Sequence, residues 1–232
     1  MVFLLHLPHA LGKETGRRYP VLYLLHGSGH DGRSVVREVR PQDHIAELGA
    51  ALLVIPNGEQ GWWLDSPLVP ACRYGEYLLE LVSWIDHNYP TRTERAARGL
   101  CGFSMGGYGA MLLASQQPHL FGTASSLLGT LDIGQLFPGY HRLRILLGPD
   151  LRTWQQHNPS QTAANLRDTA LWFCTGDNAF DRPQNDAFAG ALQSQAIPYT
   201  YEVYPGGHDT SFVRGHIQAC FAFHLRQFDA GC

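Results

Sequence analysis

Short apolar runs recur along the chain and alternate with longer segments of helical periodicity. The runs are rich in Val, Ile, Leu and aromatic residues and end near Gly, Pro or Asn, a pattern typical of buried strands. They predict strands in segments 1–8, 19–27, 51–58, 98–103, 123–129, 170–176 and 199–206.

The segments between these strands carry apolar residues at intervals of three and four, which indicates amphipathic helices. We predict helices within 34–50, 74–90, 104–118, 185–195 and 212–228, the first interrupted near Pro41 and ending at Gly49. Alternating β and α units predict an α/β fold with a mostly parallel central sheet and helices on both faces. Residues 133–168 contain no clear strand and are a candidate short lid or pocket wall.

Composition narrows the class of protein. A chain of 232 residues, 44% hydrophobic and 16% charged, fits a single domain over 1–232. The net charge of -3 gives no basic field for nucleic acid, and no apolar run approaches the roughly 18 residues of a membrane span. We therefore expect no nucleic-acid partner and no membrane insertion, and the sequence leaves open whether the chain forms a homo-oligomer.

The cysteines and the N-terminus bear on the compartment. Five cysteines are spread along the chain, an odd number that suits reduced thiols better than a disulfide framework. The first residues lack the basic start and cleavage site of a signal peptide. Both features predict a cytoplasmic protein. No HExxH or CxxC spacing occurs, so we expect neither a metal nor another cofactor.

Ser104 stands in the segment CGFSMGG, at the predicted junction of a strand and a helix. Gly102 and Gly106 complete a GxSxG pattern, in which the chain turns so sharply that bulky neighbours of the serine would clash. A glycine-rich packing turn is the alternative. The apolar strand before the pattern and the helix after it favour a nucleophile elbow with Ser104 as the nucleophile.

A serine hydroxyl needs a neighbouring base that takes its proton and later returns it to the leaving group. His208 lies in YPGGHD, a glycine-rich loop directly after the last predicted strand, at the sheet edge where ligands bind. Its loop position and its place downstream of Ser104 favour it as the base. Three other histidines remain alternatives, namely His30, His216 and His224.

The third member of a triad is a carboxylate that orients the imidazole. We expect it in the loop after the strand ending at Gly176, where Asp177 is the preferred candidate and Asp181 the alternative. Either aspartate could instead cap the helix that follows. Asp132, after the preceding strand, is a weaker third option.

Two further groups of residues complete the predicted site. An oxyanion hole requires two backbone N–H groups, and we assign them to Met105, directly after the nucleophile, and to Ser28, in the turn HGSGHDG. That turn lacks the spacing of a phosphate-binding loop. Trp62 and Trp63, in a loop after a strand, are candidates for an aromatic substrate-binding wall, and core packing is the alternative role.

The chain resembles the esterase family of α/β-hydrolases that includes S-formylglutathione hydrolase, feruloyl esterases and the antigen 85 mycolyltransferases. The resemblance runs nearly end to end and rests on PVLYLLHGSG, VIPNGEQGWWLDSP, ELVSWIDHNYP, RGLCGFSMGGYGAMLLA, HLFGTASSLLGTLDI and YPGGHD. It implies an α/β-hydrolase fold, with Ser104 and His208 at the positions of the family's nucleophile and base. The backbone groups of Ser28 and Met105 map onto its oxyanion hole.

The resemblance implies a serine esterase that cleaves small acyl or aryl, feruloyl-type esters of small molecules through a Ser-His-Asp triad. The alternatives are a thioesterase of the S-formylglutathione hydrolase type or an acyltransferase, and, in another class, a non-catalytic binding protein. The last is motivated by a departure. The family's acid lies three residues after the strand's final glycine, and that position is Ala179 here. The chain also begins about one strand later than many relatives.

Overall fold

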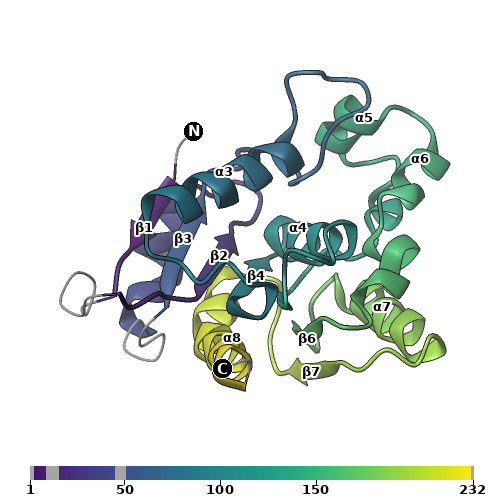
Figure 1. The fold of residues 1–232 in the computed structure, drawn as a ribbon. Coiled ribbons are helices and arrows are strands. Elements are labelled where there is room, and N and C mark those ends of the chain that lie inside the picture. The colour runs from purple at the N-terminus through teal and green to yellow at the C-terminus, as the bar shows by residue number, and fades with distance from the viewer. Residues whose placement is uncertain (1–2, 9–15, 45–50, 231–232) are drawn as a thin grey trace.

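A seven-stranded sheet forms the centre of the computed structural model, which describes residues 3–8, 16–44 and 51–230 (Figure 1). Its strand order is β1-β3-β2-β4-β5-β6-β7, and all neighbours pair in parallel except β1 and β3. The strands are β1 (Phe3–His6), β2 (Val21–Leu25), β3 (Leu52–Pro56), β4 (Arg98–Phe103), β5 (Thr123–Leu127), β6 (Ala170–Gly176) and β7 (Thr200–Tyr204). Each lies inside a segment predicted as a strand.

The central strands are buried on both faces, which explains their continuous apolar runs. In β2, Val21 and Tyr23 belong to one hydrophobic cluster, whereas Leu22 and Leu24 belong to a second cluster on the opposite face. Because side chains alternate along a strand, each face needs its own layer of helices.

The helices divide between the two faces accordingly (Figure 1). One face packs against α3 (Tyr74–Asn88), α4 (Met105–Gln116) and α7 (Arg182–Ser194), whose apolar residues share the cluster of Val21. The other face is covered by the C-terminal helix α8 (Thr210–Ala230) with the short π-helix η1 (Val35–Val39). The predicted α/β architecture with helices on both faces is confirmed.

The segment between β5 and β6 contains short helices and no strand, as predicted. Its elements are η4 (Ile133–Leu136), α5 (His141–Leu147), α6 (Leu151–Gln156) and η5 (Pro159–Leu166). In Figure 1, α5 and α6 lie at one end of the molecule, beyond α4. This segment packs on α4 through η5, so it is anchored to the helix that follows Ser104.

The crossover predicted over 34–50 is helical in its described part, and its predicted interruption near Pro41 is confirmed, but it is not one continuous α-helix. The chain forms a helical turn, α1 (Gly32–Ser34), then η1, and then the 3₁₀-helix η2 (Pro41–His44). Arg40 is left-handed, with φ 59°, and it ends η1 directly before Pro41, whose ring cannot continue a helix. The predicted end at Gly49 lies outside the described residues.

Within the described part of the chain, none of the helices is both long enough and apolar enough to cross a membrane. Four cysteines, Cys72, Cys101, Cys174 and Cys220, are buried free thiols. Cys232 lies outside the described residues.

Candidate active site

Ser104 connects β4 to α4 at the carboxyl edge of the sheet. Its backbone has φ 54° and ψ -120°, a conformation that L-residues rarely adopt and that the surrounding contacts must hold. The Ser104 N–H donates to Leu127 O at 3.0 Å, and its carbonyl accepts from Tyr108 N at 3.0 Å. The turn is therefore fixed by β5 on one side and by the first turn of α4 on the other.

Close backbone approach explains the glycine two residues after Ser104. A Cβ on Gly106 would overlap the carbonyl oxygen of Leu25, the last residue of β2. A side chain there would push α4 away from the sheet. The GxSxG pattern thus forms the tight strand-to-helix turn that the sequence predicts.

His208 lies in the loop between β7 and α8 and reaches across the sheet edge to Ser104. Its Nε2 is 2.9 Å from Ser104 Oγ, so the hydroxyl can donate its proton directly to the ring. Its Nδ1 is 2.6 Å from Asp181 Oδ1. Serine, imidazole and carboxylate form one continuous chain of hydrogen bonds.

Asp181 is fully buried, with 0% of its surface exposed, and its second carboxylate oxygen is also occupied. Oδ2 accepts hydrogen bonds from Thr175 Oγ1 at 2.6 Å and from Asn185 Nδ2 at 2.9 Å. A buried carboxylate is tolerated only when its oxygens are hydrogen-bonded. Thr175 at the end of β6 and Asn185 in α7 therefore hold Asp181 in place for His208.

The sequence-based preference for Asp177 as the carboxylate next to His208 is wrong. Asp177 is exposed, and its Oδ1 accepts from Gly206 N at 3.0 Å and from Asn178 Nδ2 at 2.9 Å. It fixes the loop that leads to His208 without touching the imidazole. Asp181 stands at the N-cap position of α7 but makes no capping bond with its side chain, which leaves the carboxylate free to face His208.

The remaining alternatives have other partners. Asp132 Oδ1 accepts from Asn158 Nδ2 at 2.6 Å, away from the imidazole. His216 Nδ1 bonds to Phe212 O within α8. His224 is buried between Thr123 and Ser125 on β5.

The turn after β2 brings Ser28 beside the nucleophile. An added Cβ at Gly27 would lie 2.8 Å from the Phe103 ring and 3.2 Å from Ser104 Cβ, so the main chain passes close to the serine. The Ser28 hydroxyl is tied back, donating to Gln60 Oε1 at 2.6 Å and lying 3.0 Å from the Tyr140 hydroxyl. Met105 begins α4, where first-turn N–H groups have no intrahelical acceptor.

His26 fixes the base of the same turn from inside the protein. Its Nε2 accepts from Gly58 N at 2.9 Å, so the neutral ring carries its proton on Nδ1 and donates to Gly27 O at 2.8 Å. Burial lowers the pKa of His26 and keeps the ring neutral. The loops after β2 and β3 are thereby joined behind the predicted oxyanion donor.

A cavity of about 220 Å³ lies directly beside Ser104 and His208. Its other walls come from the turn after β2, the ends of β4 and β5 and the start of α8, and include Ser28, His30, Phe103, Leu128 and Val213. His30 also lines this cavity, but its Nε2 lies 3.2 Å from Glu38 Oε2 and its ring packs edge-on against Phe103, so it does not take the place of His208 beside Ser104.

Trp62 and Trp63 do not line this cavity, so the structure corrects their predicted place at the substrate wall. They are 2% and 0% exposed. Trp63 donates from Nε1 to His26 O at 3.2 Å and packs where Gly109 leaves room on α4. Both are core residues. Asp65, two residues further on in the same loop, accepts a hydrogen bond from Gly75 N and so ties the loop to the start of α3.

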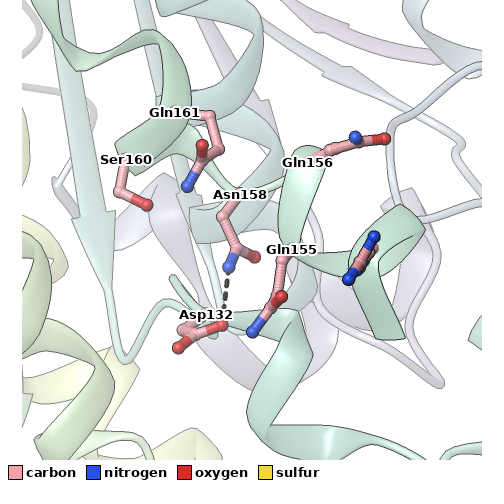
Figure 2. Close-up of a pocket in the computed structure, with 7 residues that line it drawn as sticks. Asp132, Gln155, Gln156, Asn158, Ser160 and Gln161 are labelled. Atoms are coloured by element: carbon pink, nitrogen blue, oxygen red, sulfur yellow. Dashed lines mark hydrogen bonds between the residues drawn. The ribbon is translucent and has the colours of Figure 1, made fainter. Parts of the chain in front are cut away.

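A second cavity of about 470 Å³ is lined by polar side chains (Figure 2). Most of them come from segment 133–168, and all are shown in the close-up: Asp132, Arg152, Gln155, Gln156, Asn158, Ser160 and Gln161. Asp132 connects this cavity to α7, because its N–H lies 3.4 Å from Gln184 Oε1. The segment predicted as a lid or pocket wall therefore lines this second cavity, next to α7, and contributes no lining residue to the cavity beside Ser104.

Phe180 is a site residue that the sequence-based predictions missed. Its ring lies against the His208 imidazole, with centroids 4.3 Å apart and the planes tilted by 34°. An aromatic residue directly before Asp181 is a signal in the sequence, but sequence alone does not say toward which side its ring projects.

Among the described residues, one group has the spacing of metal ligands: Cys101, Cys220 and His224, whose ligand atoms lie within 4.8 Å of one another. Both ring nitrogens of His224 are already bonded to hydroxyls, at 2.6 Å to Thr123 and 2.7 Å to Ser125. The group is fully buried, with Cys101 on β4 and both Cys220 and His224 on α8. Protein hydrogen bonds account for this cluster.

Comparison with known families gives a match over nearly the whole chain. The model of the "Putative esterase" family matches residues 1–223. Esterase Rv1288 of Mycobacterium tuberculosis is 34% identical over 232 residues, which cover 84% of this chain and 50% of that protein. The chain thus spans about half the length of this relative.

Two further comparisons agree in fold. S-formylglutathione hydrolase of Paracoccus denitrificans is 24% identical over 97% of this chain and 86% of its own length. A solved ferulic acid esterase superposes with a TM-score of 0.84 at 22% identity, covering 97% of this chain and 92% of the esterase. The fold is that of the α/β-hydrolases.

Proposed function

Because the chain belongs to the esterase family whose model matches residues 1–223, we propose that it hydrolyses carboxylic esters through an acyl-enzyme formed on Ser104. The observation that carries the proposal is the hydrogen-bonded chain from Ser104 Oγ through His208 to the buried Asp181. This geometry supplies a nucleophile, a base within reach and an orienting carboxylate.

In the first half of the reaction, Ser104 Oγ attacks the ester carbonyl while His208 Nε2 takes the hydroxyl proton. The negative charge that develops on the carbonyl oxygen is stabilised by the N–H groups of Met105 and Ser28. Asp181 keeps the Nδ1 proton on the ring and stabilises the imidazolium. His208 then protonates the leaving alcohol, and the acyl group stays on Ser104.

In the second half, water attacks the acyl-enzyme and His208 acts again as base and then as acid. The carboxylic acid product is released, and Ser104 regains its hydroxyl proton from His208. These steps need no cofactor, and the substrates we propose are small acyl or aryl esters. The free thiols of the described cysteines support a reducing compartment such as the cytoplasm as the place of action.

The test compares the wild type with Ser104→Ala in the hydrolysis of p-nitrophenyl acetate and butyrate. We expect the variant to lose at least about 10³-fold in kcat/KM, because the acyl-enzyme cannot form. Labelling by a fluorophosphonate probe checks the activated serine directly. Equal rates in the two proteins would refute the esterase proposal, and absence of labelling in the wild type would favour a non-catalytic protein.

Thioester hydrolysis is a second candidate, favoured by the likeness to S-formylglutathione hydrolase over 97% of the chain. The same triad would act, with a thiol as leaving group. Turnover of S-formylglutathione, compared with that of p-nitrophenyl acetate on one preparation, separates the two candidates. A kcat/KM higher by about 100-fold or more for the thioester would assign the chain to that class.

A further inference from the structure

Phe180 is held outward between two buried neighbours. Its side chain is 57% exposed, whereas Ala179 before it is 6% exposed and Asp181 after it is buried completely. Ala179 packs in the hydrophobic cluster below α8, and Asp181 is fixed by its hydrogen bonds. The ring therefore has little freedom to fold back into the core.

Backbone hydrogen bonds make this short loop rigid. Ala179 N donates to Gly176 O at 3.2 Å, and Arg182 N donates to Ala179 O at 3.1 Å. Phe180 lies within these turns, between the end of β6 and the start of α7. An exposed aromatic residue that the fold presents in one orientation is suited to binding.

The position of the ring says what it can contact. Its ring centroid lies 4.3 Å from that of the His208 imidazole, whose Nε2 bonds to Ser104 Oγ, and Phe180 is not part of the cavity wall. That cavity of about 220 Å³ is smaller than the roughly 300–1,000 Å³ typical of pockets that enclose a whole small-molecule ligand. An ester with one group in the cavity must extend its other large group beyond it.

We propose that Phe180 contacts the substrate and binds the apolar group of the ester that extends outside the cavity beside Ser104. The inference rests on the esterase function proposed above and names its substrate class. One arm of the ester is short enough for the cavity, and the other is an aryl or alkyl group that packs on the Phe180 ring. Burial of an aromatic face against such a group is favourable and is lost when the ring is removed.

The competing explanation is that Phe180 acts only on His208, because its ring packs against the imidazole and does not need to touch the substrate. The two explanations differ in their dependence on substrate. Shielding or positioning of His208 affects the chemistry of every ester equally, whereas substrate contact matters only for esters with a large apolar arm. Loss of contact with the bound substrate also raises KM more than it lowers kcat.

The test measures kcat/KM of the wild type, Phe180→Ala and Phe180→Leu with ethyl acetate, phenyl acetate and ethyl hexanoate by pH-stat titration. The ratio of variant to wild type for each ester cancels intrinsic reactivity. We expect Phe180→Ala to lose about three- to tenfold with phenyl acetate, ethyl hexanoate or both, mainly in KM, and less than about twofold with ethyl acetate. Phe180→Leu should recover part of the loss.

Trp84→Ala is the matched control, because Trp84 is 41% exposed in the second half of α3, on an element that contributes nothing to the site. Its ratios should be the same for all three esters. An equal loss with all esters in Phe180→Ala, or a shifted pH profile of kcat, would overturn the proposal in favour of positioning. No loss with any ester would overturn it as well. Phe180→Ala should still react with a fluorophosphonate, so its outcome is independent of the Ser104→Ala test.

Discussion

At the scale of single residues, the orientation of His208 depends on the carboxylate that meets its Nδ1. Ser104 and His208 stand in patterns whose chemistry requires their positions, a tight turn for one and a loop after the last strand for the other. The acid does not. Asp177 and Asp181 share one loop, and only the direction of each side chain decides which one meets the imidazole. That direction depends on Thr175 and Asn185, which no local pattern marks.

The two aspartates give a matched pair of substitutions. Asp181→Asn keeps the size of the side chain but removes the charge that stabilises the imidazolium, and its amide can favour the wrong tautomer of His208. We expect kcat for p-nitrophenyl acetate to fall by about 10⁴, as for the corresponding change in a serine protease. Asp177→Asn should stay within about threefold of the wild type, because its carboxylate does not touch the ring.

Circular dichroism of both variants controls for folding. A large loss in Asp177→Asn, together with a mild effect of Asp181→Asn, would contradict the geometry. If both variants lost activity equally, the loop as a whole and not one carboxylate would matter.

At the scale of elements, the central strands were predictable because each is a short run of residues buried on both faces of the sheet, whereas the edge strands β1 and β7 are partly exposed. The segment after β2 was predictable only in part, since it is helical and interrupted near Pro41 but does not form one continuous α-helix. Its apolar spacing fits a helix, but Pro41 removes a backbone donor and the left-handed Arg40 ends the π-helix before it. The Trp62 and Trp63 loop was also misjudged, since an aromatic pair after a strand fits a pocket wall and a core equally well. Tertiary packing decides both.

The elbow between β4 and α4 is the element on which the site depends, and its packing can be tested with a pair of glycines. Gly106→Ala places a methyl group against the Leu25 carbonyl, which is backbone and cannot rotate away. We expect the free energy of unfolding to fall by about 3 kcal/mol or more, measured by urea denaturation. Gly190→Ala, in the middle of α7 with nothing within 4 Å of the added methyl, should raise it by about 0.5–1 kcal/mol.

Equal unfolding free energies for the two variants would contradict the close packing of Gly106 against the Leu25 carbonyl. If Gly106→Ala were as well tolerated as Gly190→Ala, the close approach of α4 to β2 would not hold in solution. The strained backbone of Ser104 would then lack the support that the structure gives it.

At the scale of the whole molecule, the order of β and α units predicts the parallel sheet and therefore the edge at which the triad assembles. Parallel strands joined by right-handed crossovers place all their carboxyl ends together. Residues as far apart in sequence as Ser28, Ser104 and His208 thus meet around one cavity. The antiparallel pairing of β1 with β3 carries no such signal, because a short edge strand reads the same in either direction.

Two of these strand ends are joined by His26, and this connection makes stability depend on pH. Its Nε2 must stay unprotonated to accept from Gly58 N. Burial lowers the pKa of His26 in the folded protein, with His30 nearby acting in the same direction and the Gly27 carbonyl and Asp31 opposing it. Below the unfolded pKa of about 6.5 the unfolded chain therefore binds more protons than the folded one, so the free energy of unfolding decreases as pH falls.

The expected result is a His26 contribution that is complete above pH ~6.5 and is progressively lost toward pH 5. Urea denaturation of the wild type and His26→Asn across this range measures it. The variant should be less stable at pH 8 by about 1–3 kcal/mol, because Gly58 N–H loses its buried acceptor, and its stability should fall less steeply with pH. His119→Asn, at an exposed position between α4 and β5, should follow the wild-type slope. Parallel curves for the wild type and His26→Asn would mean that the loops after β2 and β3 are held together by other contacts.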